Sequence, residues 1–374
     1  MNINNLKKFN QQKFYFRNVL ILVIVSFCIT SIYAGSPNPK TFKKPKNIIF
    51  LIGDGMGTAQ IYAALTIQKD KLNIARFKVV GFQKTYSAND FITDSAAGAT
   101  AFSTGSKTKN GYLAVDTNKK TLPTILELAE GKGLSTGLVA SCAIIHATPA
   151  AFIAHEVNRD NYEDIAPWFL KTDIDVFIGG GKKYFENRTD KRNLSDSLRK
   201  RNYQLIYNLD DLNTITKDKV AGLLYNNHPP SILEGRGKML EKSSTKAISI
   251  LEKNKKGFFM MIEGSQIDWA GHSNAEDTLI SEMIDFDNVV GMVLDYAKKN
   301  GETLVVVTGD HETGGYTLPN NNIKDGKLKG KFSTNNHTAV MVPVFAYGPG
   351  AEEFMGFMEN TDIFFKFRKL LLGY

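Results

Sequence analysis

Short runs of apolar and β-branched residues recur along the chain, separated by longer stretches with helical periodicity, and this alternation restricts the possible folds. Six such runs stand out: Ile48–Ile52, Leu138–Ala140, Val176–Ile178, Phe258–Ile262, Leu304–Val307 and Val344–Tyr347. Strands that are apolar at nearly every position are buried on both faces, as in parallel sheets. The helical patterns between them include Leu122–Ala129, Thr245–Leu251 and Ile280–Tyr296. The sequence therefore predicts an α/β fold with a central, mostly parallel sheet flanked by helices on both faces.

One stretch departs from this pattern. Residues Lys182–Lys219 are polar and charged, with weaker periodicity. This favours surface helices and loops that decorate the sheet, and a small subdomain is the alternative. Because the alternation of strands and helices argues for a single α/β domain, we expect one main domain over residues 47–374.

The amino terminus has the composition of an export signal. Residues 1–34 carry four cations and no acidic residue, and an apolar stretch from Val19 to Ile32 precedes the small residues around Ala34. These are the parts of a secretory signal peptide. An uncleaved membrane anchor is the alternative, although the apolar run is shorter than a typical membrane span. We expect cleavage near Ala34, a Pro- and Lys-rich linker over residues 35–46, and a periplasmic or secreted protein.

Cleavage would also change the charge and the cysteine count. The 46 Lys and Arg residues of the whole chain would fall to 42, against 38 Asp and Glu. This surplus is too small to indicate nucleic acid or a membrane as a partner, so we expect neither nucleic-acid-specific binding nor stable membrane insertion after cleavage. Cys142 would be the one remaining cysteine, which excludes an internal disulfide.

Potential metal ligands stand just after three of the predicted strands. They are Asp54, Glu263, and the adjacent pair Asp310 and His311. Ligands of open α/β sheets bind outside the carboxyl ends of the strands. We therefore expect these side chains to converge at one edge of the sheet, although they are far apart in sequence. Each residue taken alone is equally well explained as an exposed loop acid or a helix cap.

Further Asp and His residues extend this set. Asp268 and His272 are four residues apart, so a helical turn would place both on the same face. His337 lies in a polar stretch just before another apolar run. Mixed Asp and His ligands suit zinc, whereas Glu, Thr hydroxyl and water suit magnesium. For His155 and His228 we expect structural roles.

A nucleophile candidate begins an alanine-rich segment. Ser95 opens the sequence SAAGATA, whose composition favours a helix that begins there. Helix N-termini present free N–H groups and a positive dipole end, which favour a serine alkoxide and a phosphate. Taken alone, Asp94 or Ser95 would simply be a helix cap. Beside a metal cluster the catalytic interpretation gains weight, because a zinc ion can lower the pKa of a serine without a His-based triad.

Six ordered segments resemble the alkaline phosphatase family. They are NIIFLIGDGMG (47–57), TDSAAGATAFSTGSKTKNG (93–111), HATPAAFIAHEVNR (146–159), GFFMMIEGSQID (257–268), VVTGDHETGG (306–315) and NHTAVMVPVFAYGPG (336–350). Six motifs in order make a specific signal, and they cover nearly the whole chain after the signal peptide. The resemblance implies an alkaline phosphatase-like fold and hydrolysis of phosphate monoesters to an alcohol and inorganic phosphate.

The resemblance also implies a role for each matching residue. Ser95 would attack phosphorus and become transiently phosphorylated, while Asp94 would orient Arg159. Arg159 would bind two phosphate oxygens, a task that suits the guanidinium geometry. The implied metal ligands are Asp54, Asp310 and His311 for one zinc, Asp268, His272 and His337 for a second zinc, and Asp54, Thr148 and Glu263 for a third metal, usually magnesium.

Two positions depart from the best-known bacterial pattern of the family. His146 stands where that pattern has Asp, and Trp269 stands where it has Lys. His146 adds a nitrogen ligand, so we expect the third site to take zinc or to hold magnesium less tightly. The missing Lys removes a positive group near phosphate, which predicts faster product release. The family also implies a homodimer, and the short spacing from His311 to His337 predicts a small contact.

Two alternatives remain at this stage. A phosphodiesterase or sulfatase of the same superfamily would share the metal ligands but differ at the nucleophile and at the oxygen-binding residues. The Asp94-Ser95-Ala96 motif and Arg159 favour the monoesterase. A periplasmic protein that binds phosphate or metal without turnover belongs to another class, although nothing in the sequence disables catalysis.

Overall fold

The computed structural model describes residues 11–15, 17–18, 44–319 and 328–373 of the chain. Most of the predicted signal peptide and linker lies outside these residues. The chain divides into two compact units, Met1–Phe42 and Lys43–Tyr374, and the second contains every predicted site residue. Across the described ranges, no helix has both the length and the apolar character needed to cross a membrane.

The second unit is built on one large sheet. Its described strands are β1 (Asn47–Gly53), β2 (Val79–Lys84), β3 (Ser135–Ala143), β4 (Val176–Gly180), β5 (Gln204–Ile206), β6 (Val220–Tyr225), β7 (Phe258–Gly264), β8 (Thr303–Gly309), β11 (Val342–Tyr347) and β12 (Gly356–Glu359). They lie in the order β12-β2-β11-β8-β1-β7-β3-β4-β6-β5. Within this described sheet only β11 runs antiparallel to its neighbours, β8 and β2. The predicted mostly parallel sheet is therefore confirmed.

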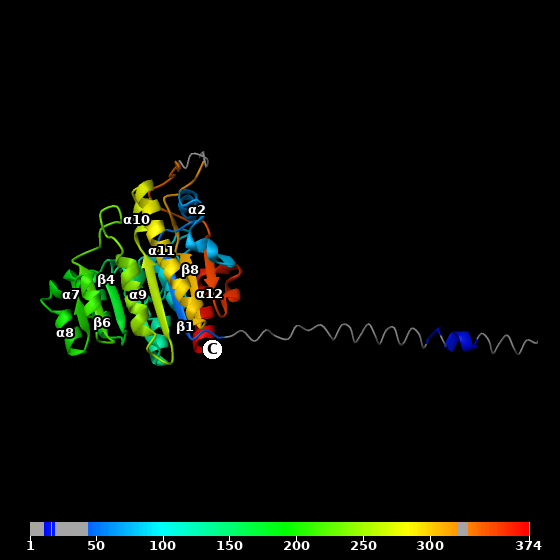
Figure 1. Ribbon diagram of the computed structural model, residues 1–374, viewed down its shortest axis with the longest axis horizontal. Helices are drawn as coiled ribbons and strands as arrows, with labels where there is room; N and C mark the ends of the chain where they lie inside the picture. The colour runs from blue at the N-terminus through cyan, green and yellow to red at the C-terminus, as the bar shows by residue number, and fades with distance from the viewer. Residues whose placement is uncertain (1–10, 16, 19–43, 320–327, 374) are drawn as a thin grey trace, which may run out of the picture. The chain divides into compact units, whose positions relative to one another are not determined.

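Helices cover both faces of the sheet. The longer ones are α2 (Thr58–Ile67), α3 (Ser95–Thr104), α4 (Ile125–Gly131), α8 (Leu194–Lys200), α9 (Met239–Leu251), α10 (Gln266–His272), α11 (Glu276–Asn300) and α12 (Asn360–Phe367). Shorter helical turns are η1 (Asn73–Arg76), α5 (Ala147–Ala150), α6 (Tyr162–Ile165), η2 (Ala166–Leu170), α7 (Lys183–Glu186), η3 (Asp210–Thr214), η5 (Ala351–Phe354) and η6 (Arg368–Leu372). Figure 1 shows α9 and α11 lying across one face of the sheet.

The central strand β1 shows why both faces are covered. All seven of its residues are buried. Ile48, Phe50 and Ile52 pack in one core cluster with residues of α3, α4 and α12, whereas Ile49 and Leu51 pack in a second cluster with residues of α9 and α11. Because successive side chains of a strand point to opposite faces, a run that is apolar throughout requires helices on both sides.

The six predicted apolar runs all lie in strands, and two of the predicted helical patterns lie in α9 and α11. The third, Leu122–Ala129, overlaps α4 from Ile125, because Thr124 caps the helix and the residues before it are not helical. The run Val344–Tyr347 differs from the parallel expectation because β11 is antiparallel, although it too is inserted between two strands. The polar region Lys182–Lys219 contains α7, α8 and η3, as expected for surface helices. It also contributes β5, which pairs with β6 and joins the region to the main sheet.

Three parallel strands end at the same level at the centre of the sheet. Gly53 of β1 pairs with Gly264 of β7 and with Gly309 of β8. The residues that follow these glycines therefore emerge side by side at the carboxyl edge. Figure 1 shows α2 and α10, which follow β1 and β7, at the same end of the sheet. The predicted convergence of ligands at one edge thus has its structural basis in the strand register.

Candidate active site

Ser95 is the first residue of α3 and is 2% exposed. Asp94 caps this helix, because its side chain accepts a hydrogen bond from the backbone N–H of Ala97. The helix begins where the alanine-rich segment predicts. The Ser95 hydroxyl donates to Asp54 Oδ1 at 3.4 Å and lies 3.3 Å from His311 Nε2. A hydroxyl at the positive end of a helix dipole is thus held against a carboxylate and an imidazole.

The first group of potential ligands comprises Asp54, Asp310 and His311, all fully buried. His311 Nε2 lies 3.4 Å from Asp54 Oδ1 and 3.3 Å from Asp310 Oδ2. Gly55 has a positive φ of 75°, and its backbone N–H donates to Asp310 Oδ1 at 3.2 Å. A Cβ on Gly55 would lie 2.6 Å from the Cα of Asp268, so only glycine lets the loop after β1 pass this close to α10.

The second group comprises Asp268 and His272 of α10 together with His337 of the short strand β10 (His337–Thr338). Both imidazole Nε2 atoms lie 3.4 Å from Asp268 Oδ1, and they are 3.0 Å from each other. The ring of His337 also stacks on that of His311 at 3.5 Å between centroids. The two groups therefore adjoin each other next to the serine.

Arg159 lies beside the capped end of α3. Its Nη1 donates to Asp94 Oδ2 at 3.0 Å, and the same oxygen accepts from the backbone N–H of Gly111 at 2.9 Å. Asp94 therefore fixes both the helix terminus and the guanidinium. An arginine held in this way, next to a helix N-terminus, has the chemistry of an anion-binding site.

A third group lies at the carboxyl ends of β3 and β7. The structure brings together Cys142, His146 and Glu263, whose ligand atoms lie within 4.8 Å of one another. His146 immediately precedes the short helix α5 without a side-chain hydrogen bond to it, and this helix also carries the buried Thr148. The sequence prediction included His146, Thr148 and Glu263 but not Cys142.

Several buried oxygen and nitrogen atoms at the carboxyl edge of the sheet could serve as ligands of a cation. Several buried polar atoms have no hydrogen-bond partner among the described residues: Asp54 Oδ2, Asp310 Oδ2, His146 Nδ1, Thr148 Oγ1 and Glu263 Oε1. Buried polar atoms are normally paired, because each unpaired one destabilises the fold. Carboxylate, imidazole and hydroxyl donors together fit divalent metal ions.

In the metal-free chain, the carboxylates of the first and third groups are shifted toward the neutral form. Burial raises the pKa of Asp54 well above its usual range, and the neighbouring Asp310 raises it further. Burial also raises the pKa of Asp310 to about 6 and that of Glu263 to about 7. A bound divalent cation would reverse this preference by stabilising the charged carboxylates.

In the second group the pKa values shift in the opposite direction and favour charged side chains. Burial raises the pKa of Asp268, but hydrogen bonds from His272 and His337 outweigh it and hold that pKa well below its usual range. The hydrogen bond to Asp268 in turn raises the pKa of His272 to about 9. Without metal this group is therefore an Asp–imidazolium cluster, and a metal ion would have to displace protons from the imidazoles to bind.

Sequence reasoning missed one further contributor, Thr313 of β9 (Glu312–Thr313). Its hydroxyl donates to Asp268 Oδ1 and lies 3.2 Å from His311 Nδ1. It thus contacts a ligand from each of the first two groups and orients both. The residue stands within the segment VVTGDHETGG, so the motif contained it without revealing its role.

His155 and His228 have contacts that agree with structural roles. The two ring nitrogens of His155 lie 2.9 Å from the Ala114 carbonyl and 2.9 Å from Glu127 Oε1. His228 Nδ1 accepts from the backbone N–H of Ala143 at 3.1 Å, and its ring packs edge-on against Trp269.

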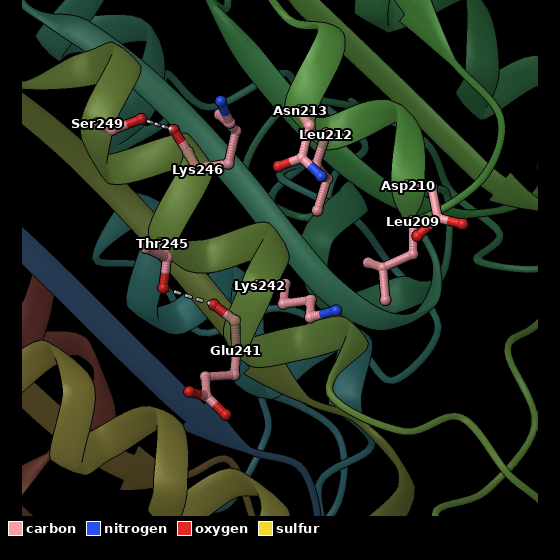
Figure 2. A pocket seen from close by; sticks show the side chains of 9 residues that line it. All are labelled: Leu209, Asp210, Leu212, Asn213, Glu241, Lys242, Thr245, Lys246 and Ser249. Atoms are coloured by element: carbon pink, nitrogen blue, oxygen red, sulfur yellow. Dashed lines mark hydrogen bonds between the residues drawn. The ribbon is translucent and has the colours of Figure 1, made fainter.

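A surface pocket of about 500 Å³ lies between η3 and α9, and none of the predicted site residues line it. Figure 2 shows Leu209 and Leu212 on one side and the polar side chains of α9 on the other. The hydroxyls of Thr245 and Ser249 are used within the helix, since they donate to the carbonyls of Glu241 and Lys246. The pocket therefore offers no free hydroxyl nucleophile from Thr245 or Ser249, and it contains none of the predicted metal ligands.

Comparison with known proteins gives concordant matches. Residues 45–330 match the model of the family described as alkaline phosphatase. The chain is 34% identical to alkaline phosphatase 4 of Bacillus subtilis (strain 168), over 94% of this chain and 96% of that protein. The solved structure of alkaline phosphatase from the Antarctic bacterium TAB5 matches with a TM-score of 0.86 and 42% identity, over 89% of this chain and 99% of that chain. A His-to-Asp mutant of the TAB5 enzyme with Mg bound in its M3 site matches with a TM-score of 0.86 and 41% identity, over the same shares.

Proposed function

Because the chain belongs to the alkaline phosphatase family, we propose that it hydrolyses phosphate monoesters through attack of Ser95 on phosphorus and a transient phosphoserine. The observation that carries the proposal is the position of the Ser95 hydroxyl, at a helix N-terminus and in contact with Asp54 and His311. These contacts support a nucleophilic role for Ser95 beside the first ligand group.

The proposed metal ligands follow the three groups at the sheet edge. Two zinc ions would be held by the first group (Asp54, Asp310 and His311) and by the second group (Asp268, His272 and His337). When bound, such ions supply positive charge that lowers the pKa of a neighbouring hydroxyl and neutralises phosphate oxygens. The oxygen Asp54 Oδ2, which has no hydrogen-bond partner among the described residues, supports this assignment.

The protein itself performs the positioning. Asp94 holds Arg159 so that its guanidinium can bind two oxygens of the phosphate dianion. The N-terminus of α3 presents backbone N–H groups to the same anion. Phosphoryl transfer depends mainly on positioning and charge neutralisation, and a monoester dianion benefits from this positive site more than a diester does.

The third metal would be held by Asp54, His146, Thr148 and Glu263, with magnesium or zinc as its occupant. The Mg-bound M3 site of the TAB5 His-to-Asp mutant offers a precedent for a third site in a relative whose occupant is magnesium when Asp is present. The imidazole of His146 supports a preference for zinc here, because magnesium prefers oxygen ligands.

The test is to trap the intermediate. Protein incubated with a phosphate monoester and quenched in acid should carry phosphate on the peptide that contains Ser95, and Ser95→Ala should carry none. Phosphate found on another residue, or full turnover by Ser95→Ala, would overturn the proposal. Comparing nitrophenyl phosphate with its bis ester separates the monoesterase from a phosphodiesterase, and the monoester should be strongly preferred.

We also propose export and dimer formation. Cleavage near Ala34 can be tested by determining the amino-terminal residue of protein recovered from outside the cytoplasm. The edge strand β12 and the turn before it expose Phe357 (74% exposed) and Met355 (61% exposed), an apolar edge that supports a homodimer contact. Light scattering should give twice the chain mass, and a monomer at all concentrations would refute this contact.

A further inference from the structure

Cys142 stands among the donors of the third group. It is fully buried near the carboxyl end of β3, and its Sγ lies 3.3 Å from Glu263 Oε2. The register explains the contact, because Ala140 of β3 pairs with Glu263 of β7. The ligand atoms of Cys142, His146 and Glu263 all lie within 4.8 Å of one another.

Three buried polar atoms of the same group lie near this thiol and are poorly satisfied by hydrogen bonds. His146 Nδ1 makes no hydrogen bond with any described residue; Glu263 Oε1 and Thr148 Oγ1 make none of good geometry, although the Thr148 hydroxyl lies near enough to Glu263 to lower its pKa, and all three side chains are more than nine-tenths buried. A buried imidazole nitrogen and a buried carboxylate oxygen left unpaired point to a cation as the missing partner. The thiol therefore does not stand alone as evidence for a ligand.

We propose that Cys142 Sγ is a ligand of the third metal and that this site binds zinc in preference to magnesium. The inference deepens the proposed function, since it rests on a metal being held by His146 and Glu263. Sulfur, nitrogen and oxygen donors together form a zinc-type ligand set, whereas magnesium requires oxygen donors in octahedral geometry. On binding, the thiol releases its proton to solvent and the thiolate forms the bond to the metal.

A different interpretation makes Cys142 a small buried residue that only fills space. Its Sγ also lies 3.2 Å from the carbonyl oxygen of Ala143, and buried free cysteines are common in protein cores. The two interpretations differ in one observable property, which is whether sulfur bonds directly to the metal. Activity alone does not separate them, so the test reads that bond.

The experiment replaces the bound metals with Co²⁺ in the whole mature protein and records the near-ultraviolet spectrum. A thiolate bound to Co²⁺ gives an intense charge-transfer band, which carboxylate, imidazole and hydroxyl ligands do not give. Wild type should show this band, and Cys142→Ser and Cys142→Ala should lose it. A chain that begins after Ala34 lacks Cys28, so a thiolate band recorded from it can come only from Cys142.

Metal content measured on the same samples distinguishes the possible failures. After dialysis against excess magnesium, wild type should retain one more zinc per chain than Cys142→Ser, which should hold magnesium in its place. Cobalt bound without the band, or a band that persists in both Cys142 variants, would overturn the inference while leaving the two other metals intact. A protein that binds no metal at all would instead refute the proposed function. Circular dichroism confirms that each variant is folded.

Discussion

Arg236 is buried between two acids of α11, Glu282 and Asp285, and binds both of them. Its Nη1 lies 3.1 Å from Glu282 Oε1, and its Nη2 lies 3.0 Å from Asp285 Oδ2. At the sheet edge, by contrast, Asp54 and Asp310 are equally buried, and the ring of His311 is the one ion-pair partner recorded for them within the described chain. The structural cluster (Arg236, Glu282 and Asp285) therefore contains its own cation, whereas the functional cluster (Asp54, Asp310 and His311) does not.

This difference separates a structural cluster from a functional one. A buried acid that is paired with arginine is satisfied by the fold itself, and removal of the arginine would leave uncompensated charge. At the sheet edge, no Arg or Lys side chain of the described residues forms an ion pair with Asp54 or Asp310, and Asp54 Oδ2 has no hydrogen-bond partner there, so the metal-free fold leaves these acids uncompensated. A chain accepts such a site when an external cation completes it, and the same cation then serves catalysis.

The largest expected effect concerns the functional cluster. Ser95→Ala should lower kcat by at least about a thousandfold, because the attacking oxygen is lost. The free energy of unfolding should change by less than about 1 kcal/mol, since only one hydroxyl with long hydrogen bonds is removed. Steady-state kinetics and thermal unfolding check both. Retention of a tenth of the activity would contradict the assignment of Ser95.

The opposite pattern is expected for the structural cluster. Arg236→Met should lower the free energy of unfolding by about 3–5 kcal/mol, because two buried carboxylates lose their partner. The metal content and kcat of the folded fraction should stay unchanged. Arg199→Met is the matched control, since Arg199 forms an exposed ion pair with Asp196 and its loss should cost under about 1 kcal/mol. Equal destabilisation by both changes would remove the distinction between the clusters.

A smaller effect follows from the raised pKa of Glu263. The folded pKa of about 7 lies above the unfolded value of 4.5, so the folded state binds more protons between these pH values. The metal-free protein should therefore lose stability as pH rises through that window. Metal-free Glu263→Gln should melt a few degrees higher than metal-free wild type at pH 8 and show a reduced difference at pH 5.

Zinc should reverse the order at pH 8, because only wild type retains the full ligand set. Glu241→Gln, which removes a partly exposed acid of α9, is the control and should show neither behaviour. The predicted role of Glu263 protonation would be contradicted if the difference in melting temperature between metal-free wild type and metal-free Glu263→Gln were the same at pH 5 and pH 8.

The smallest effect concerns product release. Trp269 packs edge-on against His228 at 4.8 Å and against His146 at 5.8 Å between ring centroids, so an aromatic ring stands where a cation would strengthen phosphate binding. Trp269→Lys should lower the inhibition constant of phosphate by about fivefold, the equivalent of about 1 kcal/mol. Unchanged inhibition would refute the idea that the missing lysine speeds release.

The sequence predicted the parts of this molecule that local pattern determines. The strands β1, β7 and β8 are apolar at nearly every position, and each ends at a glycine with an acid beside it, which follows the glycine in β1 and β8 and precedes it in β7. The strand β2 was not predicted because it is only partly buried and has no continuous apolar run, since Gly81, Gln83 and Lys84 interrupt its apolar residues. The antiparallel direction of β11 depends on the path of the chain between β8 and β11, which periodicity does not record.

Local sequence pattern also predicts only part of the candidate site. Spacing predicted that Asp54, Asp310 and His311 would meet at one edge of the sheet and that Asp268 and His272 would share a helix face, whereas the division into two groups and the place of His337 came from the family resemblance. Cys142 enters the third group only through the pairing of β3 with β7, a contact between residues more than a hundred positions apart. Thr313 likewise reaches Asp268 across the ribbon of β9 and β10. Registers of this kind have to be read from the structure.

The central claim is that buried carboxylates and imidazoles at the carboxyl edge of the sheet hold metal ions beside Ser95. Anomalous diffraction at the zinc absorption edge, from crystals of the protein purified with zinc, tests it most directly. We expect peaks within bonding distance of Asp54, Asp310 and His311, and of Asp268, His272 and His337. Crystals with full zinc occupancy elsewhere and no peak at these groups would contradict it.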